Sequence, residues 1–383
     1  LAAWHNDSLQ HQTNRYLKDQ FGFRKPLVRL NNQLAWTFYH KARARDIVIG
    51  KENWLYEAGY IHTRYGKDYV GHEKLKKWVT QTQKLQKMLL NYGKLLVVVL
   101  APGKASIYPE YIPDHLRETP NSPTNYTEFS ALLRQKEVNL IDCNAWFKTI
   151  KPTSPYPLYP KTGIHWSVYG KYLVVDSLLQ YIQAKTGKDQ PNMLHQRPIS
   201  QSPPTADDRD IERGLNLLFP IPCPPMGYPN VCFDRIGKRM LRSLTIADSY
   251  WWGIQGRGIA GRIFRKPEFW YYNEEIYGGP GRESSSVSKI DPAIAFADRD
   301  LIILMCTDAK LKHFSWDLLD NYAADPDFEM KMAKASIAQT ISEIRDDKSW
   351  LKKIGLAAEN RGISLDSMLY LNAKYLLWAR LPR

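Results

Sequence analysis

The sequence predicts an α/β protein built around a parallel sheet, and three apolar runs carry that prediction. Leu95–Ala101 and Leu301–Thr307 are unbroken, as expected of strands that are buried on both faces. The third run, Arg242–Ala247, contains a β-branched pair and ends abruptly at Asp248 and Ser249. Helical patterns separate the runs along the chain, and this alternation of helix and strand is typical of parallel sheets with right-handed crossovers.

The segment before the first central strand is predicted to be mainly helical. Large apolar residues recur at helical spacing over about 6–45, and a short hairpin follows over 46–56. A long amphipathic helix is expected from about 72 to 92, where Gly93 stops it. We assign residues 1–60 to N-terminal helices and a small hairpin packed on the main domain.

The main domain is predicted to span residues 61–322. After the first central strand come a helix, a second strand over 138–142, and a helix over 167–185 that Ser167 caps. Residues 188–232, rich in Pro and Gln, are expected to form a long irregular excursion over the surface.

The serine-bearing strand is followed by a helix, by a strand over 268–273 and by the last apolar strand. Residues 323–383 show helical periodicity, and we expect them to form a C-terminal helical extension that closes over the sheet.

Composition restricts the partners of the chain. It has 383 residues and a net charge of +14, with Lys and Arg spread along its whole length. A DNA-binding protein concentrates such charge in one stripe or arm, so we expect no nucleic-acid partner. A basic surface of this kind suits anionic polysaccharide or lipid headgroups. No apolar run approaches the length of a membrane helix, and the start at Leu1 leads us to expect a signal or anchor upstream.

The four cysteines are too few to form a disulfide scaffold in a chain of this size. Cys143 and Cys306 lie in or beside apolar runs and are expected in the core. Cys223 and Cys232 flank a Pro-rich segment. The sequence allows two alternatives for them, a disulfide between the two or two free thiols. No spacing of Cys or His suggests zinc, so we expect neither metal nor cofactor.

Ser249 and His165 are the candidates for a nucleophile and its base. A serine at the carboxyl end of a central strand lies where open α/β sheets bind their ligands. His165 stands in a loop that enters a helix, after the second strand. The two side chains are expected to meet over one edge of the sheet, where the imidazole takes the hydroxyl proton. The alternatives are that Ser249 only caps a helix and that His165 is structural.

Four segments in order resemble the SGNH-hydrolase-like proteins of alginate and exopolysaccharide O-acetylation, the AlgX/AlgJ family of the SGNH/GDSL superfamily. Residues 50–56 (GKENWLY) resemble its early GKdgWLF segment, and 101–110 (APGKASIYPE) resemble its P-x-K…iYPe loop. Residues 165–170 (HWSVYG) resemble its D-x-H-W-S…G motif, and 247–250 (ADSY) its G-D-S-f serine motif.

The resemblance implies a three-layer, flavodoxin-like sheet, the SGNH hydrolase fold, in a permuted order in which the histidine precedes the serine. It also implies that Ser249 is the nucleophile that carries the acetyl group, and that His165 is first the general base and then the general acid. The Ser249 N–H, with a donor from another loop, would form the oxyanion hole.

One departure from the family concerns the acid. Gly163 stands where the family has its acid, two residues before the histidine. Such an acid fixes the imidazole tautomer and stabilises the imidazolium. We name Asp142, at the carboxyl end of a strand, as the replacement, and the alternatives are a weaker dyad or an inactive site. Asp248 is expected to shape the turn before the serine rather than to join the triad.

Five further residues are predicted to line the substrate pocket, because aromatic and polar side chains suit a sugar. They are Lys104, Tyr108, Trp166, Tyr250 and Asn273. For each of them the alternative is a role in packing or on the surface.

The sequence therefore predicts a serine acyl enzyme, an O-acetyltransferase or acetylesterase that acts on cell-envelope or secreted polysaccharide. The alternative is a catalytically impaired relative that binds polysaccharide or scaffolds an acetylation complex. We expect a monomer with a membrane acetyl-transfer protein as partner, in the periplasm or another extracytoplasmic compartment, with any N-terminal anchor outside this chain.

Overall fold

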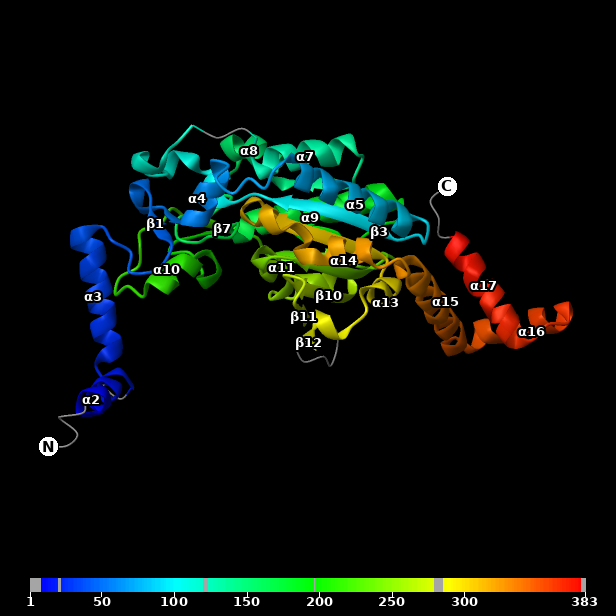
Figure 1. The fold of residues 1–383 in the computed structure, drawn as a ribbon. Coiled ribbons are helices and arrows are strands. Elements are labelled where there is room, and N and C mark those ends of the chain that lie inside the picture. Colours follow the sequence, from blue (N-terminus) through cyan, green and yellow to red (C-terminus); the bar gives the residue numbers. More distant parts are fainter. Residues whose placement is uncertain (1–7, 20–21, 120–122, 196, 279–284, 380–383) are drawn as a thin grey trace.

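The strands form one large sheet and three small ribbons. The structure, a computed structural model, describes residues 8–19, 22–119, 123–195, 197–278 and 285–379 (Figure 1). Its strands are β1 (Ile47–Ile49), β2 (Leu55–Glu57), β3 (Leu95–Ala101), β4 (Leu140–Asp142), β5 (Asn192–His195), β6 (Ile199–Gln201), β7 (Met226–Tyr228), β8 (Val231–Asp234), β9 (Arg242–Ala247), β10 (Arg265–Tyr271), β11 (Glu275–Tyr277), β12 (Ser285–Ser286) and β13 (Leu301–Thr307).

The large sheet has the order β12-β11-β10-β9-β13-β3-β4. From β10 to β4 all neighbouring strands are parallel, whereas β11 and β12 extend the edge in antiparallel orientation. The predicted α/β class with a mostly parallel sheet is therefore confirmed. The three apolar runs that predicted it are adjacent at the centre, where β13 lies between β3 and β9.

Helices alternate with the strands along the chain. They are α2 (Ser8–Asp19), α3 (Arg24–Tyr39), α4 (Ala58–Arg64), α5 (His72–Leu90), α6 (Lys104–Ile107), α7 (Asn125–Gln135), α8 (Cys143–Ile150), α9 (Val168–Thr186), α10 (Asp210–Leu215), α11 (Trp252–Gln255), α12 (Ile259–Ile263), α13 (Pro292–Ala297), α14 (Leu318–Ala324), α15 (Phe328–Asp346), α16 (Lys348–Arg361) and α17 (Leu365–Ala379). The predicted helices over 72–92 and 167–185 match α5 and α9.

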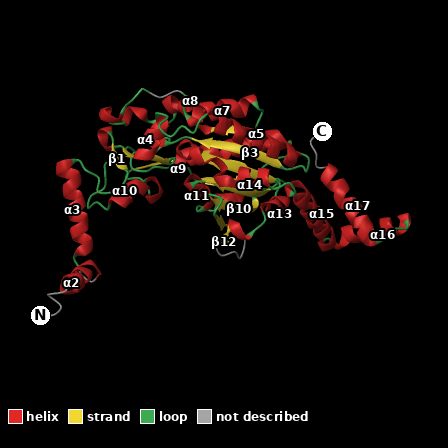
Figure 2. Cartoon of the chain, in the orientation of Figure 1, coloured by secondary structure: helices red, strands yellow, loops and turns green. Residues whose placement is uncertain are grey.

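Both faces of the sheet are covered by helices (Figure 2). Because successive side chains of a strand point to opposite faces, Val97 and Ile303 join a buried cluster with α8, α9, α11 and α12. Val98 and Leu304 join a second cluster with α5, α7, α13 and α14. Burial on both faces explains why the central strands lack polar residues in alternation.

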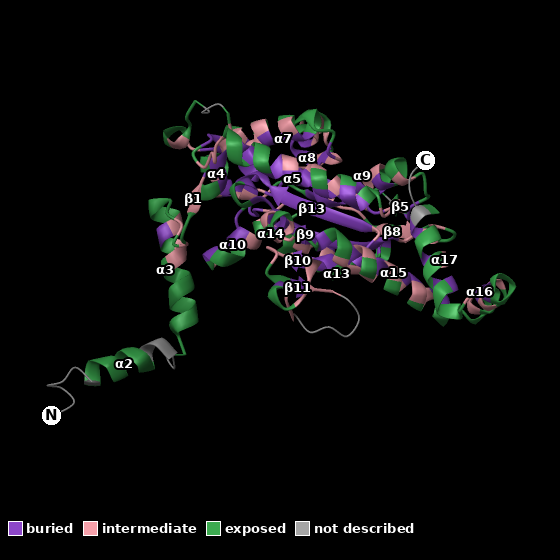
Figure 3. Cartoon of the chain, turned by 45° about the vertical axis from the view of Figure 1, so that its right-hand side comes forward, coloured by how far each residue is buried: buried purple, intermediate pink, exposed green. Residues whose placement is uncertain are grey.

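The two ends of the chain extend away from the sheet in opposite directions (Figure 1). Helices α2 and α3 are largely exposed, as are α16 and α17 (Figure 3). Residues 6–7 and 20–21 of the predicted N-terminal helical region lie outside the described residues. The start of α15 packs on the sheet cluster through Phe328 and Met332, whereas its end forms a separate cluster with α16 and α17. The expectation that the C-terminal helices close over the sheet is therefore wrong for α16 and α17.

The excursion over 188–232 is more regular than predicted. It contains α10 and two antiparallel ribbons, β5 with β8 and β6 with β7. Cys223 and Cys232 are both free thiols, so the disulfide alternative is wrong. Cys232 lies in β8 opposite Leu194, whereas the Cys223 thiol donates to the carbonyl of Ile221 at 3.3 Å. Among the described residues, no helix combines the length and the apolar character that a bilayer crossing requires.

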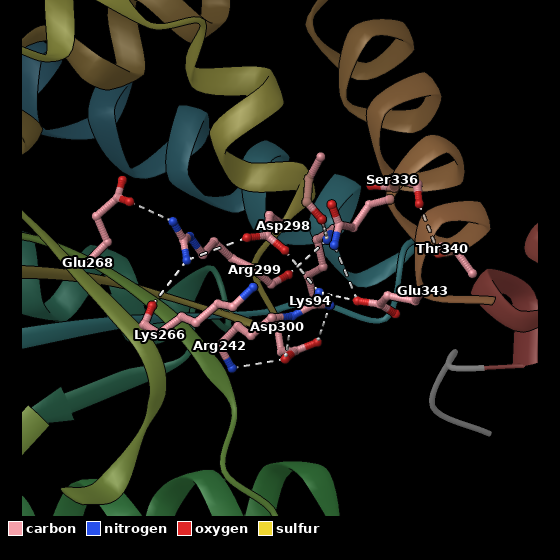
Figure 4. Close-up of polar contacts among 12 residues, drawn as sticks. Lys94, Arg242, Lys266, Glu268, Asp298, Arg299, Asp300, Ser336, Thr340 and Glu343 are labelled. Atoms are coloured by element: carbon pink, nitrogen blue, oxygen red, sulfur yellow. Dashed lines mark hydrogen bonds and ion pairs between the residues drawn. The ribbon is translucent and has the colours of Figure 1, made fainter. Parts of the chain in front are cut away.

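An ionic network stabilises the amino edge of the sheet (Figure 4). Arg242, the first residue of β9, is 4% exposed. Its guanidinium donates to Asp298 at 3.0 Å, to Asp300 at 3.2 Å and to Glu343 of α15 at 2.7 Å. The network therefore ties the C-terminal extension to the first residue of β9, the strand that Ser249 follows at its other end.

Replacing Arg242 by alanine is expected to destabilise the fold by about 3 kcal/mol or more, because it leaves partly buried carboxylates without their cation. The matched control is Arg345→Ala, which breaks the exposed ion pair with Asp366 and should change stability little. Urea unfolding of both variants measures the difference, and equal losses would contradict the role given to the network.

Candidate active site

Three side chains from distant parts of the chain meet at the carboxyl edge of the sheet. Ser249 follows β9, His165 lies in the loop before α9, and Asp210 is the first residue of α10. The imidazole Nε2 of His165 lies 3.0 Å from the Ser249 hydroxyl, and its Nδ1 lies 2.5 Å from the Asp210 carboxylate. A hydroxyl, an imidazole and a carboxylate in this order form the arrangement that activates a serine nucleophile.

Local hydrogen bonds position the histidine loop. The Ser167 hydroxyl accepts from the N–H of Gly170 at 3.0 Å and caps α9, as predicted. The carbonyl of Ile164 accepts from the Tyr250 hydroxyl at 2.9 Å, which ties the histidine loop to the residue after Ser249. The Tyr250 ring also packs edge-on against the imidazole, with centroids 4.8 Å apart. Tyr250, the residue after Ser249, thus holds both the His165 loop and the imidazole ring in place.

Backbone hydrogen bonds hold the Asp210 carboxylate beside the imidazole of His165. One carboxylate oxygen accepts from the backbone N–H groups of Ile164 at 2.8 Å and Ile211 at 2.9 Å, and the other faces the imidazole. Burial by itself raises the pKa of this carboxyl, but the hydrogen bond and charge of His165 and the two N–H donors together lower it below its usual value. Asp210 therefore remains ionised and is able to stabilise an imidazolium.

The prediction that Asp142 orients the imidazole is wrong. Its carboxylate caps α8 by accepting from the N–H of Ala145 at 2.9 Å, and it also accepts from the Tyr126 hydroxyl and from Arg134. These partners occupy Asp142 as a structural residue, and it makes no contact with His165.

Gly163 makes room for Asp210. A Cβ atom at position 163 would lie 2.8 Å from the Asp210 carboxylate and 2.7 Å from the ring of Pro160. The carboxylate thus occupies the space in front of position 163, and the absence of a side chain there is what admits it. The departure from the family motif is compensated by a carboxylate from another segment.

Adding a methyl group at position 163 is expected to lower activity by about tenfold to a hundredfold, because it displaces the carboxylate from the imidazole. The matched control is Gly214→Ala in α10, where a Cβ meets nothing within 4 Å. Turnover of p-nitrophenyl acetate by the two variants checks this, and a Gly163→Ala enzyme as active as Gly214→Ala would contradict it.

A cleft of about 390 Å³ opens beside the Ser249 hydroxyl. Its walls come from the loop before α9, the start of α10, and the turn that follows Ser249. The lining residues are His165, Trp166, Lys171, Asp207, Asp210, Ser249, Tyr250, Trp252, Gly253, Gly256 and Arg257. Aromatic walls with a few convergent polar groups are typical of small-molecule sites.

Lys171 brings a cation into this cleft. It lies on the first turn of α9 with 4% of its surface exposed, and Gly253 leaves room for it, since a Cβ there would lie 2.4 Å from its Cε. Burial lowers the pKa of Lys171 to about 8, and the nearby charge of Arg257 acts in the same direction. Near neutral pH the cleft therefore carries a positive charge that is lost in mild alkali.

The KM for an acyl ester that carries a carboxylate is expected to rise severalfold as the pH increases through about 8, because Lys171 then loses its charge. The KM for uncharged p-nitrophenyl acetate should not follow this change. In the Lys171→Met variant the rise should disappear. A rise of the same size in Lys171→Met would contradict the assignment.

The structure separates the five predicted pocket residues. Trp166 and Tyr250 line the cleft. Lys104 and Tyr108 do not, so their predicted contact with substrate is wrong. The Lys104 ammonium is fully buried and donates to the carbonyls of Leu55, Lys161 and Gly163 at 2.7–2.8 Å, so it fixes the chain just before His165.

Tyr108 is also structural. Its hydroxyl accepts from the N–H of Leu158 at 3.1 Å, and its ring stacks on Trp54. Asn273 lies at the same edge of the sheet but lines a different hollow, and its amide donates to the carbonyl of Trp316 at 2.9 Å.

Asp248 lies in the turn that presents Ser249. One carboxylate oxygen accepts from the N–H of Tyr250 at 3.1 Å, and the other accepts from both the N–H and the hydroxyl of Thr307 at 2.7 Å. These bonds join the end of β9 to the end of β13. Its contacts are those of a turn-forming residue.

Sequence reasoning missed three residues of the site. Asp210 and Lys171 are described above, and Tyr272, directly after β10, is the third, because its hydroxyl interacts with Ser249. The acidic cluster at 207–210 in a long excursion was the available signal for Asp210. In the described part of the chain, no group of three or more His, Cys, Asp or Glu side chains is placed to hold a metal ion.

Comparisons with known proteins match part of the chain. A family model described as "SGNH hydrolase-like domain, acetyltransferase AlgX" matches residues 47–207, which include Gly163 and His165 and end before Asp210 and Ser249. A Pseudomonas aeruginosa protein named "Probable alginate O-acetylase AlgJ" is 26% identical over 175 residues, 45% of this chain. The match spans 42% of that relative, less than half of its length.

Two solved structures resemble the chain distantly. The O-acetyltransferase domain of Pseudomonas putida AlgJ has a TM-score of 0.45 and 15% identity, with 76% of this chain and 99% of that chain covered. Pseudomonas aeruginosa AlgX has a TM-score of 0.44 and 12% identity, with 75% and 70% covered.

Residues 47–207 thus match an SGNH-hydrolase-like domain, in a chain whose mostly parallel sheet has helices on both faces. Within that class the chain resembles the AlgX/AlgJ family, as the order of its motifs predicted.

Proposed function

We propose that the protein is a serine acyl enzyme that transfers or removes acetyl groups on a polysaccharide. The observation that carries the proposal is the continuous path from Asp210 through His165 to Ser249, with 2.5 Å and 3.0 Å between the successive polar atoms. The family match and the name of the AlgJ relative support acetyl chemistry on a polysaccharide.

In this proposal His165 takes the proton of the Ser249 hydroxyl while the oxygen attacks the carbonyl carbon of an acetyl ester. Asp210, ionised beside Nδ1, stabilises the imidazolium that forms. The Ser249 N–H, with a second donor from another loop, stabilises the developing oxyanion. His165 then returns the proton to the leaving oxygen, and an acetyl group remains on Ser249. Attack by a sugar hydroxyl or by water, with the same proton path, completes transfer or hydrolysis.

The alternative, a catalytically impaired relative that binds polysaccharide, depended on Gly163 at the acid position. Because Asp210 stands against the imidazole, Gly163 no longer argues for a missing acid. The geometry therefore favours the enzyme over the scaffold.

The finer assignments belong to the same proposal. We infer a flavodoxin-like, three-layer arrangement with the histidine motif before the serine motif, a periplasmic location, and a membrane protein that supplies the acetyl group. What supports these inferences is the resemblance of the chain to the AlgX/AlgJ family. Nothing in the site requires a cofactor for this chemistry.

The proposal is tested with p-nitrophenyl acetate as donor and short polysaccharide fragments as acceptors, with released acetate and acetylated sugar measured separately. The expected result is turnover of the ester, with acetylated sugar when an acceptor is present. A protein that yields neither acetate nor acetylated sugar from any acetyl ester would overturn the proposal.

A further inference from the structure

A second and larger hollow lies at the same edge of the sheet as Ser249. It measures about 840 Å³, and none of its lining residues lines the cleft beside the nucleophile. Its walls include the residues that directly follow β10 and the segment between β13 and α14. Ligand pockets in proteins span about 300–1,000 Å³, so this hollow holds far more than an acetyl group.

Tyr272 connects this hollow to the nucleophile. It belongs to the wall of the hollow, and its hydroxyl interacts with Ser249. Its backbone N–H donates to the carbonyl of Ala247 at 3.0 Å, which fixes it to the strand that presents Ser249. A ligand against this ring therefore lies next to the acyl position.

Two strained segments face each other across this wall. Tyr272 and Asn273 have φ of 51° and 55°, and Ser315, Trp316 and Asp317 have φ of 63°, 44° and 64°. This left-handed region is unfavourable for residues with a side chain. Such strain persists only where the surrounding structure imposes it, and it clusters at ligand sites.

Direct contacts join the two segments. The Asn273 amide donates to the Trp316 carbonyl at 2.9 Å, and the rings of Tyr272 and Trp316 lie 5.3 Å apart at 64°. The two rings thus form adjoining walls at a fixed angle. Both side chains are only partly buried, so their faces are accessible.

The chemistry of the hollow suits a sugar. Several charged groups in its wall are already paired: Lys331 lies 2.8 Å from Asp325, and Asp320 lies 2.7 Å from Lys77. The other groups in the wall include aromatic side chains, whose faces pack on the apolar face of a pyranose ring. They also include amide and hydroxyl groups, which form hydrogen bonds with the sugar hydroxyls.

We propose that the hollow walled by Tyr272 and Trp316 is a saccharide-binding subsite that places a sugar ring of the acetyl acceptor beside Ser249. The inference that a saccharide binds in this hollow depends only on the geometry, whereas the inference that this saccharide is the acetyl acceptor rests on the proposed function. In that role, the sugar hydroxyl oxygen bonds to the acetyl carbon, and the bond from that carbon to the Ser249 Oγ breaks. His165 takes the hydroxyl proton and returns it to Oγ.

The test is calorimetric titration of the full chain with short manno-oligosaccharides and with their mannuronate counterparts. Wild type is expected to bind at least one of these probes. Trp316→Ala should weaken that binding by about tenfold or more, and Trp316→Phe, which retains a flat ring, should recover part of it. The control is Phe38→Ala, which removes a 72%-exposed aromatic ring on α3, and it should bind like wild type.

Two outcomes would overturn the subsite: a wild type that binds neither probe, or a Trp316→Ala protein with a wild-type melting curve that binds as tightly as wild type. Trp316→Phe decides the matter if Trp316→Ala fails to fold, because a phenylalanine variant that melts like wild type but binds neither probe would also contradict a ring-stacking wall.

Labelling of wild type by a fluorophosphonate separates this inference from the proposed function. A protein that binds saccharide through Trp316 but is never labelled at Ser249 would overturn the acyl-enzyme proposal and support the subsite. A protein that is labelled at Ser249 but binds neither probe would support the acyl-enzyme proposal and overturn the subsite.

Discussion

Ser249→Ala is expected to lower the kcat for acetyl-ester turnover by about a thousandfold or more. The variant has no oxygen to attack the acetyl carbon, and His165 loses the partner that lies 3.0 Å from its Nε2. The side chain is only partly buried, and alanine fits in its place, so the loss should be chemical and not structural.

The matched control is Ser106→Ala. The Ser106 hydroxyl also lies near the carboxyl edge of the sheet, but it donates to Asp308 at 2.6 Å and not to the histidine. This variant should retain turnover even if its melting temperature falls. A Ser249→Ala protein that retains more than about a tenth of wild-type kcat would contradict the assignment of the nucleophile.

Asp210→Asn is expected to lower kcat/KM by about a thousandfold to ten-thousandfold, with a small effect on stability. An amide of the same shape cannot stabilise the imidazolium by charge, and its N–H group favours the tautomer that leaves Nε2 protonated and unable to accept from Ser249. The backbone N–H groups of Ile164 and Ile211 still find an amide oxygen to bond.

Asp142→Asn is the control for this experiment, because the sequence alone pointed to Asp142. Asparagine caps a helix about as well as aspartate, so α8 should persist and activity should change little. Turnover of p-nitrophenyl acetate by both variants distinguishes the two carboxylates. An equal loss in the two, or a larger loss in Asp142→Asn, would contradict the role given to Asp210.

The sheet was predictable because its central strands are buried on both faces, which leaves a signal in the sequence itself. The apolar runs Leu95–Ala101 and Leu301–Thr307 are the strands β3 and β13. Ser249 and His165 were also accessible to sequence reasoning. Each stands at a boundary between a strand or loop and a helix, where the topology of a parallel sheet brings such residues to one edge.

The acid was not predictable, because its identity depends on how a long excursion folds back onto the sheet. Nothing local distinguishes Asp210 from Asp207 and Asp208, and only the fold brings one of the three to the imidazole. The contact predicted for Lys104 was wrong for a different reason: a polar side chain in a loop suits a sugar, but this lysine is fully buried, which is rare for the residue type. Three backbone carbonyls satisfy its ammonium group instead.

The central claim is that Ser249, activated by His165 and Asp210, carries the acetyl group. The most direct measurement is peptide mass spectrometry of wild type quenched in acid during turnover of p-nitrophenyl acetate. The predicted result is one acetyl group on the peptide that contains Ser249, absent from Ser249→Ala. An acetyl group found only on Lys171, the amine in the same cleft, or on no residue of the cleft, would contradict the claim.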